Sequence, residues 1–168
     1  MMKTKLHIVL LFAFAALIAS CTGSKLTAEE RAQRAAVTAQ AVMDAINNRS
    51  FTIDIDRMSP RSMPARSLNY GYSLRLSGDS IYSDLPYVGR AYRVPYDGGH
   101  ALSFSGLLSG YSVTRSKKGF TRVEMTYEDS EDHYYYVLDI FDNGFSTLEC
   151  VSRERDRINF SGQVDFTR

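Results

Sequence analysis

The chain has 168 residues, with 20 Lys or Arg and 19 Asp or Glu, which gives a formal net charge of +1 at pH 7. Nucleic-acid-binding domains show a strong basic excess or a basic stripe, so this balance excludes them and we expect no nucleic-acid partner. The length is that of one ordinary domain with a core of its own.

The first 20 residues have the plan of a lipoprotein signal peptide. A basic start at Met1–Lys5 is followed by an apolar run over Ile8–Ile18, which is shorter than the roughly 20 residues that span a bilayer. The run ends in Ile18-Ala19-Ser20-Cys21, which resembles the lipobox of bacterial lipoproteins. We predict that residues 1–20 are removed and that Cys21 carries the lipid; the alternative is an ordinary signal peptide with an incidental cysteine.

A lipid anchor on Cys21 predicts a membrane-bound protein, since several acyl chains hold a protein firmly. No acidic sorting signal follows the cysteine, and by resemblance to other diderm lipoproteins this favours the outer membrane, with the domain facing the periplasm. Residues 21–26 form a tether and residues 27–168 a single domain. With Cys21 lipidated, Cys150 has no disulfide partner, and its alternation with Leu148 predicts a buried, inert thiol.

The first predicted element is a helix. Thr27 and Glu30 have the spacing of a capping box, which satisfies amide donors at a helix start, and Asn47-Asn48 is a plausible stop. The stripe of small and apolar residues between them is expected to pack on the protein's own sheet; a coiled coil or a partner helix is the alternative. That stripe consists of Ala32, Ala35, Ala36, Ala39, Val42, Met43 and Ile46.

From Phe51 onward apolar residues recur at every second position, which is typical of half-buried strands. Residues 57–69 contain two prolines and three arginines and predict an exposed connection. Gly-containing turns at 77–80, 117–119 and 142–144 predict hairpins. The predicted strands cover residues 51–55, 70–76, 81–82, 101–105, 111–115, 120–127, 133–141, 145–151 and 158–166.

The strand at 133–141 decides the fold class. Tyr134, Tyr136, Leu138 and Ile140 alternate along one face, while the other face is also partly apolar, so both faces need cover. We therefore predict an α+β fold in which the N-terminal helix packs on a curved antiparallel β-meander sheet. A small closed β-barrel is the alternative.

No combination of residues indicates a reaction. Beyond the signal peptide the only histidines are His100 and His133, and no serine lies in a G-x-S-x-G turn. Asp97 and His100 are three residues apart but have no further ligand nearby in sequence. The acidic run 128–132 is expected to be a solvated turn rather than a calcium loop. We predict no metal, no cofactor and, on balance, no enzymatic activity.

The segment 85–100 gathers aromatic and basic side chains. Tyrosine offers an apolar ring with a polar tip and arginine a planar donor fork, a pairing suited to sugars, peptides or carboxylates. The alternative is a clasp whose tyrosines pack over a sheet edge and bond its backbone. The predicted ligand-binding residues are Tyr87, Arg90, Tyr92, Arg93, Tyr96 and His100.

The same segment carries a family resemblance. The string Leu85-Pro86-Tyr87-Val88-Gly89-Arg90-Ala91-Tyr92, with Gly78-Asp79-Ser80, Pro95-Tyr96 and Phe141-Asp142-Asn143-Gly144, resembles the Bacteroides-type lipoproteins with the domain of unknown function 4251. The similarity covers most of residues 38–168. It implies a lipoprotein of the cell envelope, and it transfers no activity and no catalytic residues.

The sequence therefore favours a non-enzymatic binding or accessory module, anchored through Cys21 and presenting residues 85–100 to an envelope ligand or protein. One alternative is a hydrolase of envelope glycan or peptide polymers that uses Asp97 and His100. Another is a structural or inhibitory partner of a second envelope protein.

Overall fold

The computed structural model describes residues 26–69, 71–92, 101–130 and 132–166. The chain divides into two units, Met1–Arg34 and Ala35–Arg168. The sheet and its core lie in the second unit.

Helix α2, Ala28–Asn47, begins at the predicted capping box. The Thr27 amide donates to Glu30 Oε2 at 2.7 Å, and the Glu30 amide donates to Thr27 Oγ1 at 3.2 Å. The helix ends at Asn47 as predicted, but the left-handed residue is Arg49, with a φ of 49°. Arg49 takes this conformation where the chain turns into the sheet, and its carbonyl accepts a hydrogen bond from the Gly78 amide at 2.8 Å.

The helix packs on the sheet through its last turns. Val42 and Ile46 are buried, and the Tyr111 hydroxyl donates to the Ile46 carbonyl at 3.1 Å. The predicted stripe is thus confirmed only at its C-terminal end, because Ala32, Ala35 and Ala36 are exposed. Among the described residues, no helix is long and apolar enough to cross a bilayer.

Within the described residues, ten strands form one antiparallel sheet. Their bounds are β1 Ser50–Pro60, β2 Arg66–Ser67, β3 Ser73–Ser77, β4 Ser80–Pro86, β5 Ala101–Leu107, β6 Gly110–Arg115, β7 Phe120–Glu128, β8 His133–Phe141, β9 Phe145–Ser152 and β10 Ile158–Asp165. The order is β5-β4-β3-β1-β10-β9-β8-β7-β6, with the short β2 paired to β1.

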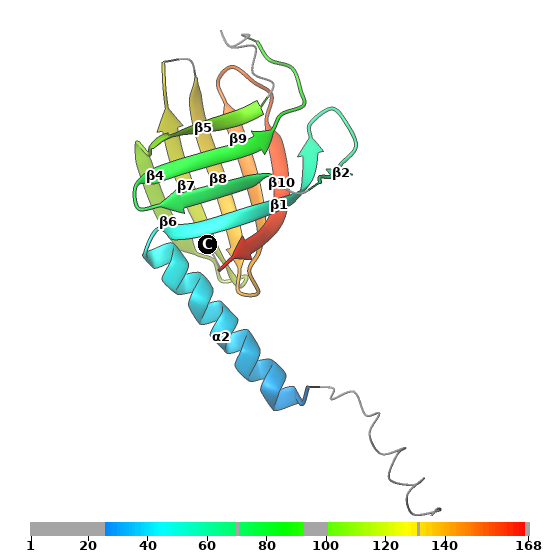
Figure 1. Ribbon diagram of the computed structural model, residues 1–168, viewed down its shortest axis with the longest axis vertical. Helices are drawn as coiled ribbons and strands as arrows, with labels where there is room; N and C mark the ends of the chain where they lie inside the picture. The colour runs from blue at the N-terminus through cyan, green and yellow to red at the C-terminus, as the bar shows by residue number, and fades with distance from the viewer. Residues whose placement is uncertain (1–25, 70, 93–100, 131, 167–168) are drawn as a thin grey trace, which may run out of the picture. The chain divides into compact units, whose positions relative to one another are not determined.

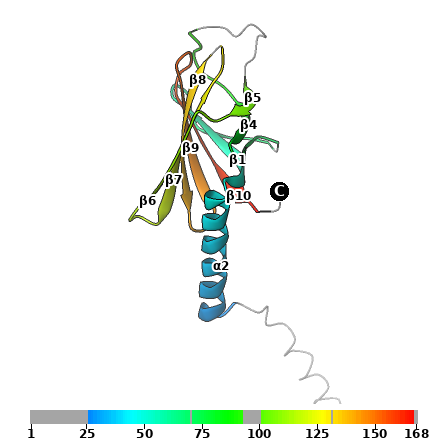
Figure 2. The same ribbon diagram turned by 90° about the vertical axis from the view of Figure 1, so that its left-hand side faces the viewer.

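The sheet curves strongly, so that β1, β4 and β5 run across β7, β8 and β9 (Figures 1 and 2). Along the described part of the chain, no ladder joins the end strands β5 and β6. The result is a half-barrel, which confirms the predicted α+β meander over the closed-barrel alternative.

Two strands extend further than predicted. β1 continues to Pro60 through an irregularity in its register with β10 between Ile55 and Arg57, although residues 57–69 were expected to be a connection throughout. The bulge places Asp56 and Arg57 consecutively on the solvent side, which breaks the alternation that identifies a strand. β4 likewise runs on to Pro86, into the Tyr/Arg segment.

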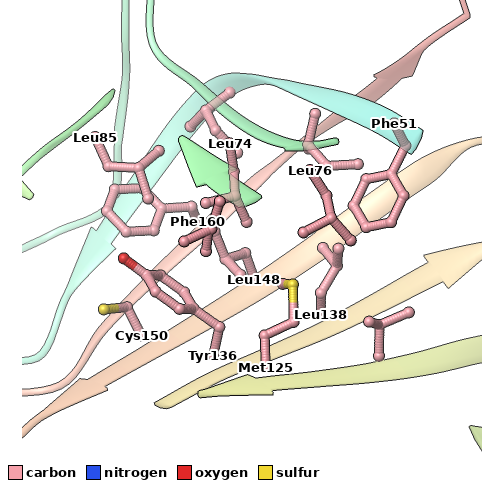
Figure 3. Packing of buried hydrophobic residues seen from close by; sticks show 14 of the residues in the cluster. Phe51, Leu74, Leu76, Leu85, Met125, Tyr136, Leu138, Leu148, Cys150 and Phe160 are labelled. Carbon is pink, nitrogen blue, oxygen red and sulfur yellow. The ribbon is translucent and has the colours of Figure 1, made fainter. Parts of the chain in front are cut away.

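The core fills the inner face of the curved sheet (Figure 3). The Phe104 ring of β5 stacks on Tyr127 of β7 and Tyr134 of β8, each at 4.5 Å between ring centroids. The Ser83 hydroxyl of β4 lies 3.2 Å from the Tyr136 hydroxyl of β8. Side chains from the two halves of the sheet therefore meet directly.

Cys150 of β9 belongs to this core and is 2% exposed. Burial raises the pKa of its thiol from 9.0 to about 12, because a thiolate would lose its hydration inside the protein. The prediction that this cysteine is buried is confirmed, and its protonated form explains why we expect it to be inert.

Candidate functional site

The Tyr/Arg segment is described from Leu85 to Tyr92. Of the predicted ligand-binding residues, Tyr87, Arg90 and Tyr92 lie in this part. Arg93, Tyr96 and His100 lie outside the described residues, as do Asp97 and the predicted lipidation site Cys21.

Residues 90–92 lie against the loop between β9 and β10. The Tyr92 amide donates to the Glu154 carbonyl at 2.7 Å, and the Asp156 amide donates to the Arg90 carbonyl at 3.0 Å. Ala91 and Arg155 form an isolated antiparallel bridge between these two bonds. The contact has the pattern of a short strand pair, which fixes the segment at this point.

Tyr87 is half-buried beneath this bridge. Its hydroxyl donates to the Arg90 carbonyl at 2.7 Å and lies 3.4 Å from the Asp156 carbonyl. The Arg155 guanidinium lies 5.4 Å from the centre of the Tyr87 ring, and burial raises the pKa of the phenol. A Cβ at position 89 would lie 2.7 Å from the Tyr87 hydroxyl oxygen, so Gly89 leaves room for this hydroxyl to reach the Arg90 carbonyl.

The β9–β10 loop is held in turn by one buried carboxylate. Asp132 Oδ1 accepts hydrogen bonds from the amides of Arg153 and Glu154, at 3.1 and 3.3 Å, and Asp132 Oδ2 accepts one from the Ser152 hydroxyl. A carboxylate satisfied by several donors at once fixes their relative positions. The loop is therefore a firm support for the segment that crosses it.

Two side chains point outward from this support, and we call residues Arg90–Tyr92 the ridge. Tyr92 is 64% exposed, and its hydroxyl lies 3.0 Å from Asp156 Oδ1. Arg90 is also exposed. The structure thus divides the predicted residues: the Tyr87 hydroxyl bonds the protein's own backbone, whereas Arg90 and Tyr92 face solvent.

Sequence reasoning missed a second set of polar residues on the outer face of the sheet. Two adjoining hollows there share Arg57, Phe145 and Ser161 in their linings. Alternation does predict that these positions face outward, but only the strand register brings them together from β1, β9 and β10. Within the described ranges, no three His, Cys, Asp or Glu side chains gather as metal ligands.

Comparison with known proteins identifies the family. The family model described as "Domain of unknown function (DUF4251)" matches residues 33–164. A crystal structure of a DUF4251 family protein from Bacteroides eggerthii is similar, with a TM-score of 0.62 and 11% sequence identity, covering 76% of this chain and 87% of that chain. At this identity the similarity shows the fold alone. No curated protein matches the chain.

Proposed function

Because the chain belongs to the DUF4251 family, a family of unknown function, we propose a function for it from its own exposed surface. The protein is a non-enzymatic binding module of the cell envelope. A lipid on Cys21 holds it to the outer membrane on the periplasmic side, and the ridge contacts an envelope protein or peptide.

The observation that carries this proposal is that Tyr92 is exposed and yet held in place. Its amide bonds Glu154, its hydroxyl bonds Asp156, and its ring remains 64% exposed. An aromatic side chain that is already ordered loses little conformational entropy when it binds. Exposed aromatic rings of this kind are common anchors in protein interfaces.

Arg90 adds a charged donor two residues away. A guanidinium offers a planar fork that suits carboxylates, so a partner with an acidic side chain or a chain terminus fits the ridge. Arg93, Tyr96 and His100 follow directly in the sequence, and the proposal includes them in the same ligand surface.

A photo-reactive amino acid at position 92 of the lipidated protein tests the ridge in intact cells. We expect a discrete crosslinked product from position 92 and none from position 82, because Tyr82 is a partly exposed aromatic residue that lies on β4 and does not belong to the ridge. Arg90→Ala should weaken crosslinking from position 92. Equal products from both positions, or none from position 92, would contradict the proposal.

The anchor has a separate test. The intact chain should take up labelled palmitate in a diderm bacterium and sediment with its membranes, whereas Cys21→Ala should remain unlabelled and soluble. A Cys21→Ala protein that still incorporates the label would refute the assignment.

A further inference from the structure

The outer face of β1, β10, β9, β8 and β7 carries cross-strand rows of polar side chains. Their register is fixed by the ladders between neighbouring strands. One row consists of Arg57, Ser161, Thr147, Asp139 and Arg122, the next of Ser59, Asn159, Glu149, Val137 and Glu124, and a third begins with Asp54, Gln163 and Phe145. Hydroxyls, amides, carboxylates and guanidinium groups thus alternate across several strands.

This face is hollowed rather than flat. One hollow of about 790 Å³ extends from Phe145 to Asp54 and Asp56, and a second of about 430 Å³ extends from Phe145 to Glu149 and Arg122. Both are lined by Arg57, Phe145 and Ser161, and we call them together the outer-face groove. From β1 to β7 the groove crosses four strand spacings, or about 19 Å.

The charged groups of the groove differ in how they are satisfied. Arg122 donates two hydrogen bonds to Asp139, at 2.7 and 2.8 Å. In the part of the chain that the structure describes, neither the Arg57 guanidinium nor the Asp56 carboxylate has an ion pair or a hydrogen bond. The β1 bulge places these two residues next to each other on the outer face, and Arg57 lines both hollows. Bulges often re-aim side chains for function.

Phe145 supplies an apolar surface at the junction of the two hollows. It is 39% exposed, and its ring centroid lies 5.9 Å from that of Phe141. The contact with Phe141 orients the ring, while the exposed part remains available to a ligand.

We infer that the outer-face groove binds an uncharged oligosaccharide. Sugar hydroxyls both donate and accept hydrogen bonds, which matches a lining of Arg57, Asp56 and Ser161 together with amides and further hydroxyls. The C–H faces of a sugar ring are apolar and pack on an aromatic ring such as Phe145. A groove that crosses five strands accommodates several sugar units rather than one.

The lining disfavours the other extended polymers. Four carboxylates, from Asp54, Asp56, Asp139 and Glu149, line the groove with two arginines, and a third, Arg157, pairs with Glu149 at 2.7 Å. Carboxylates still outnumber arginines, which disfavours a polyanion. A peptide that binds as an added strand gains its affinity from main-chain hydrogen bonds at an exposed sheet edge. The groove lies in the middle of the sheet, where backbone groups are already paired in ladders.

Calorimetric titration of the soluble domain, with Cys21 replaced by Ser, tests the inference. The probes are uncharged hexasaccharides of glucose, mannose, xylose and N-acetylglucosamine. We expect saturable binding of at least one probe and little change with added salt, since no ligand charge is involved. Arg57→Gln and Phe145→Leu should each weaken that binding by at least about tenfold.

Arg75→Gln and Tyr82→Leu are the matched controls, because they replace an arginine and an aromatic residue on the outer side of β3 and β4, outside the groove. They should leave the affinity within about twofold. The inference is overturned if no probe binds, if the groove variants bind as well as the controls, or if a uronate polymer or an acidic peptide binds better than every neutral probe. It is independent of the ridge, so failure of the crosslinking experiment would not affect it.

Discussion

The two faces of the same sheet differ in what their side chains do. On the inner face, Leu138 and Ile140 of β8 are fully buried against the other half of the sheet. On the outer face of the same strand, Asp139 pairs with Arg122 and borders an open groove. The difference indicates that the inner face determines stability, which leaves the outer face and the ridge available for binding.

The largest expected effect is on the free energy of unfolding, and it compares a leucine on the inner face with a leucine on the outer face. Leu138→Ala should destabilise the fold by about 2–5 kcal/mol, because it leaves a cavity among side chains that cannot close over it. Leu107→Ala, at a leucine that is 72% exposed on the outer side of β5, should change stability by no more than about 0.5 kcal/mol. Urea unfolding followed by circular dichroism measures both. Similar losses of unfolding free energy for the two variants would contradict the claim that the inner face determines stability.

Gly162 tests a place where the outer-face groove and the sheet's own packing depend on the same backbone. It lies opposite the β1 bulge, and a Cβ there would be 2.0 Å from the Asp54 carbonyl oxygen. Gly162→Ala should therefore cost about 1–3 kcal/mol or more, and should disturb the groove because Arg57 depends on the same bulge. Gly110→Ala on β6 is the control, since its Cβ would meet only a side chain, Thr126, at 3.1 Å.

The buried thiol and phenol of the inner face predict alkaline sensitivity. Burial raises the pKa of Cys150 to about 12 and that of Tyr136 well above 10.0. The unfolded chain ionises these groups at their ordinary values near 9.0 and 10.0, before the folded chain does. The contribution of Cys150 to stability is therefore complete below about pH 9 and is lost as the pH rises towards about 12, and that of Tyr136 begins to fall above about pH 10.

Urea midpoints measured from about pH 8 to about pH 11 should fall accordingly. Cys150→Ala should show a shallower fall than the parent, because one of the groups whose pKa is raised by burial is removed. A midpoint that is flat across this range would show that neither group is buried as described.

The smallest expected effect concerns the support of the ridge. Tyr87→Phe removes the hydroxyl that bonds the Arg90 carbonyl and should cost about 0.5–1.5 kcal/mol. Tyr92→Phe removes a bond at an exposed position and should cost less. Thermal unfolding compares the two variants; a larger loss for Tyr92→Phe would reverse the roles that we assign to these tyrosines.

Local patterns predicted the elements well. The capping box at Thr27 and Glu30 fixed the helix start, and the Asp142-Asn143-Gly144 turn separated β8 from β9 where expected. The alternation of β8 identified its buried face, because successive side chains of a strand point to opposite faces of the sheet. The family resemblance, drawn from the string at 85–92, is also confirmed.

What could not be predicted depends on contacts between distant residues. The bulge beside Arg57 broke the alternation and concealed the second half of β1. The half-buried position of Tyr87 depends on a loop more than 60 residues away, which Asp132 holds. The groove combines Arg57 with Phe145, and neither residue stands out within its own stretch of sequence. The roles of Cys21 and of residues 93–100 stay predictions.

The most direct test of the central claim is the unfolding free energy of the double variant Arg57→Gln/Phe145→Leu, measured in urea beside Leu138→Ala. Surface substitutions away from core contacts usually change stability by less than about 0.5 kcal/mol each, so the double variant should stay within about 1 kcal/mol of the parent. A loss as large as that of Leu138→Ala would show that the outer-face groove is part of what holds the fold together.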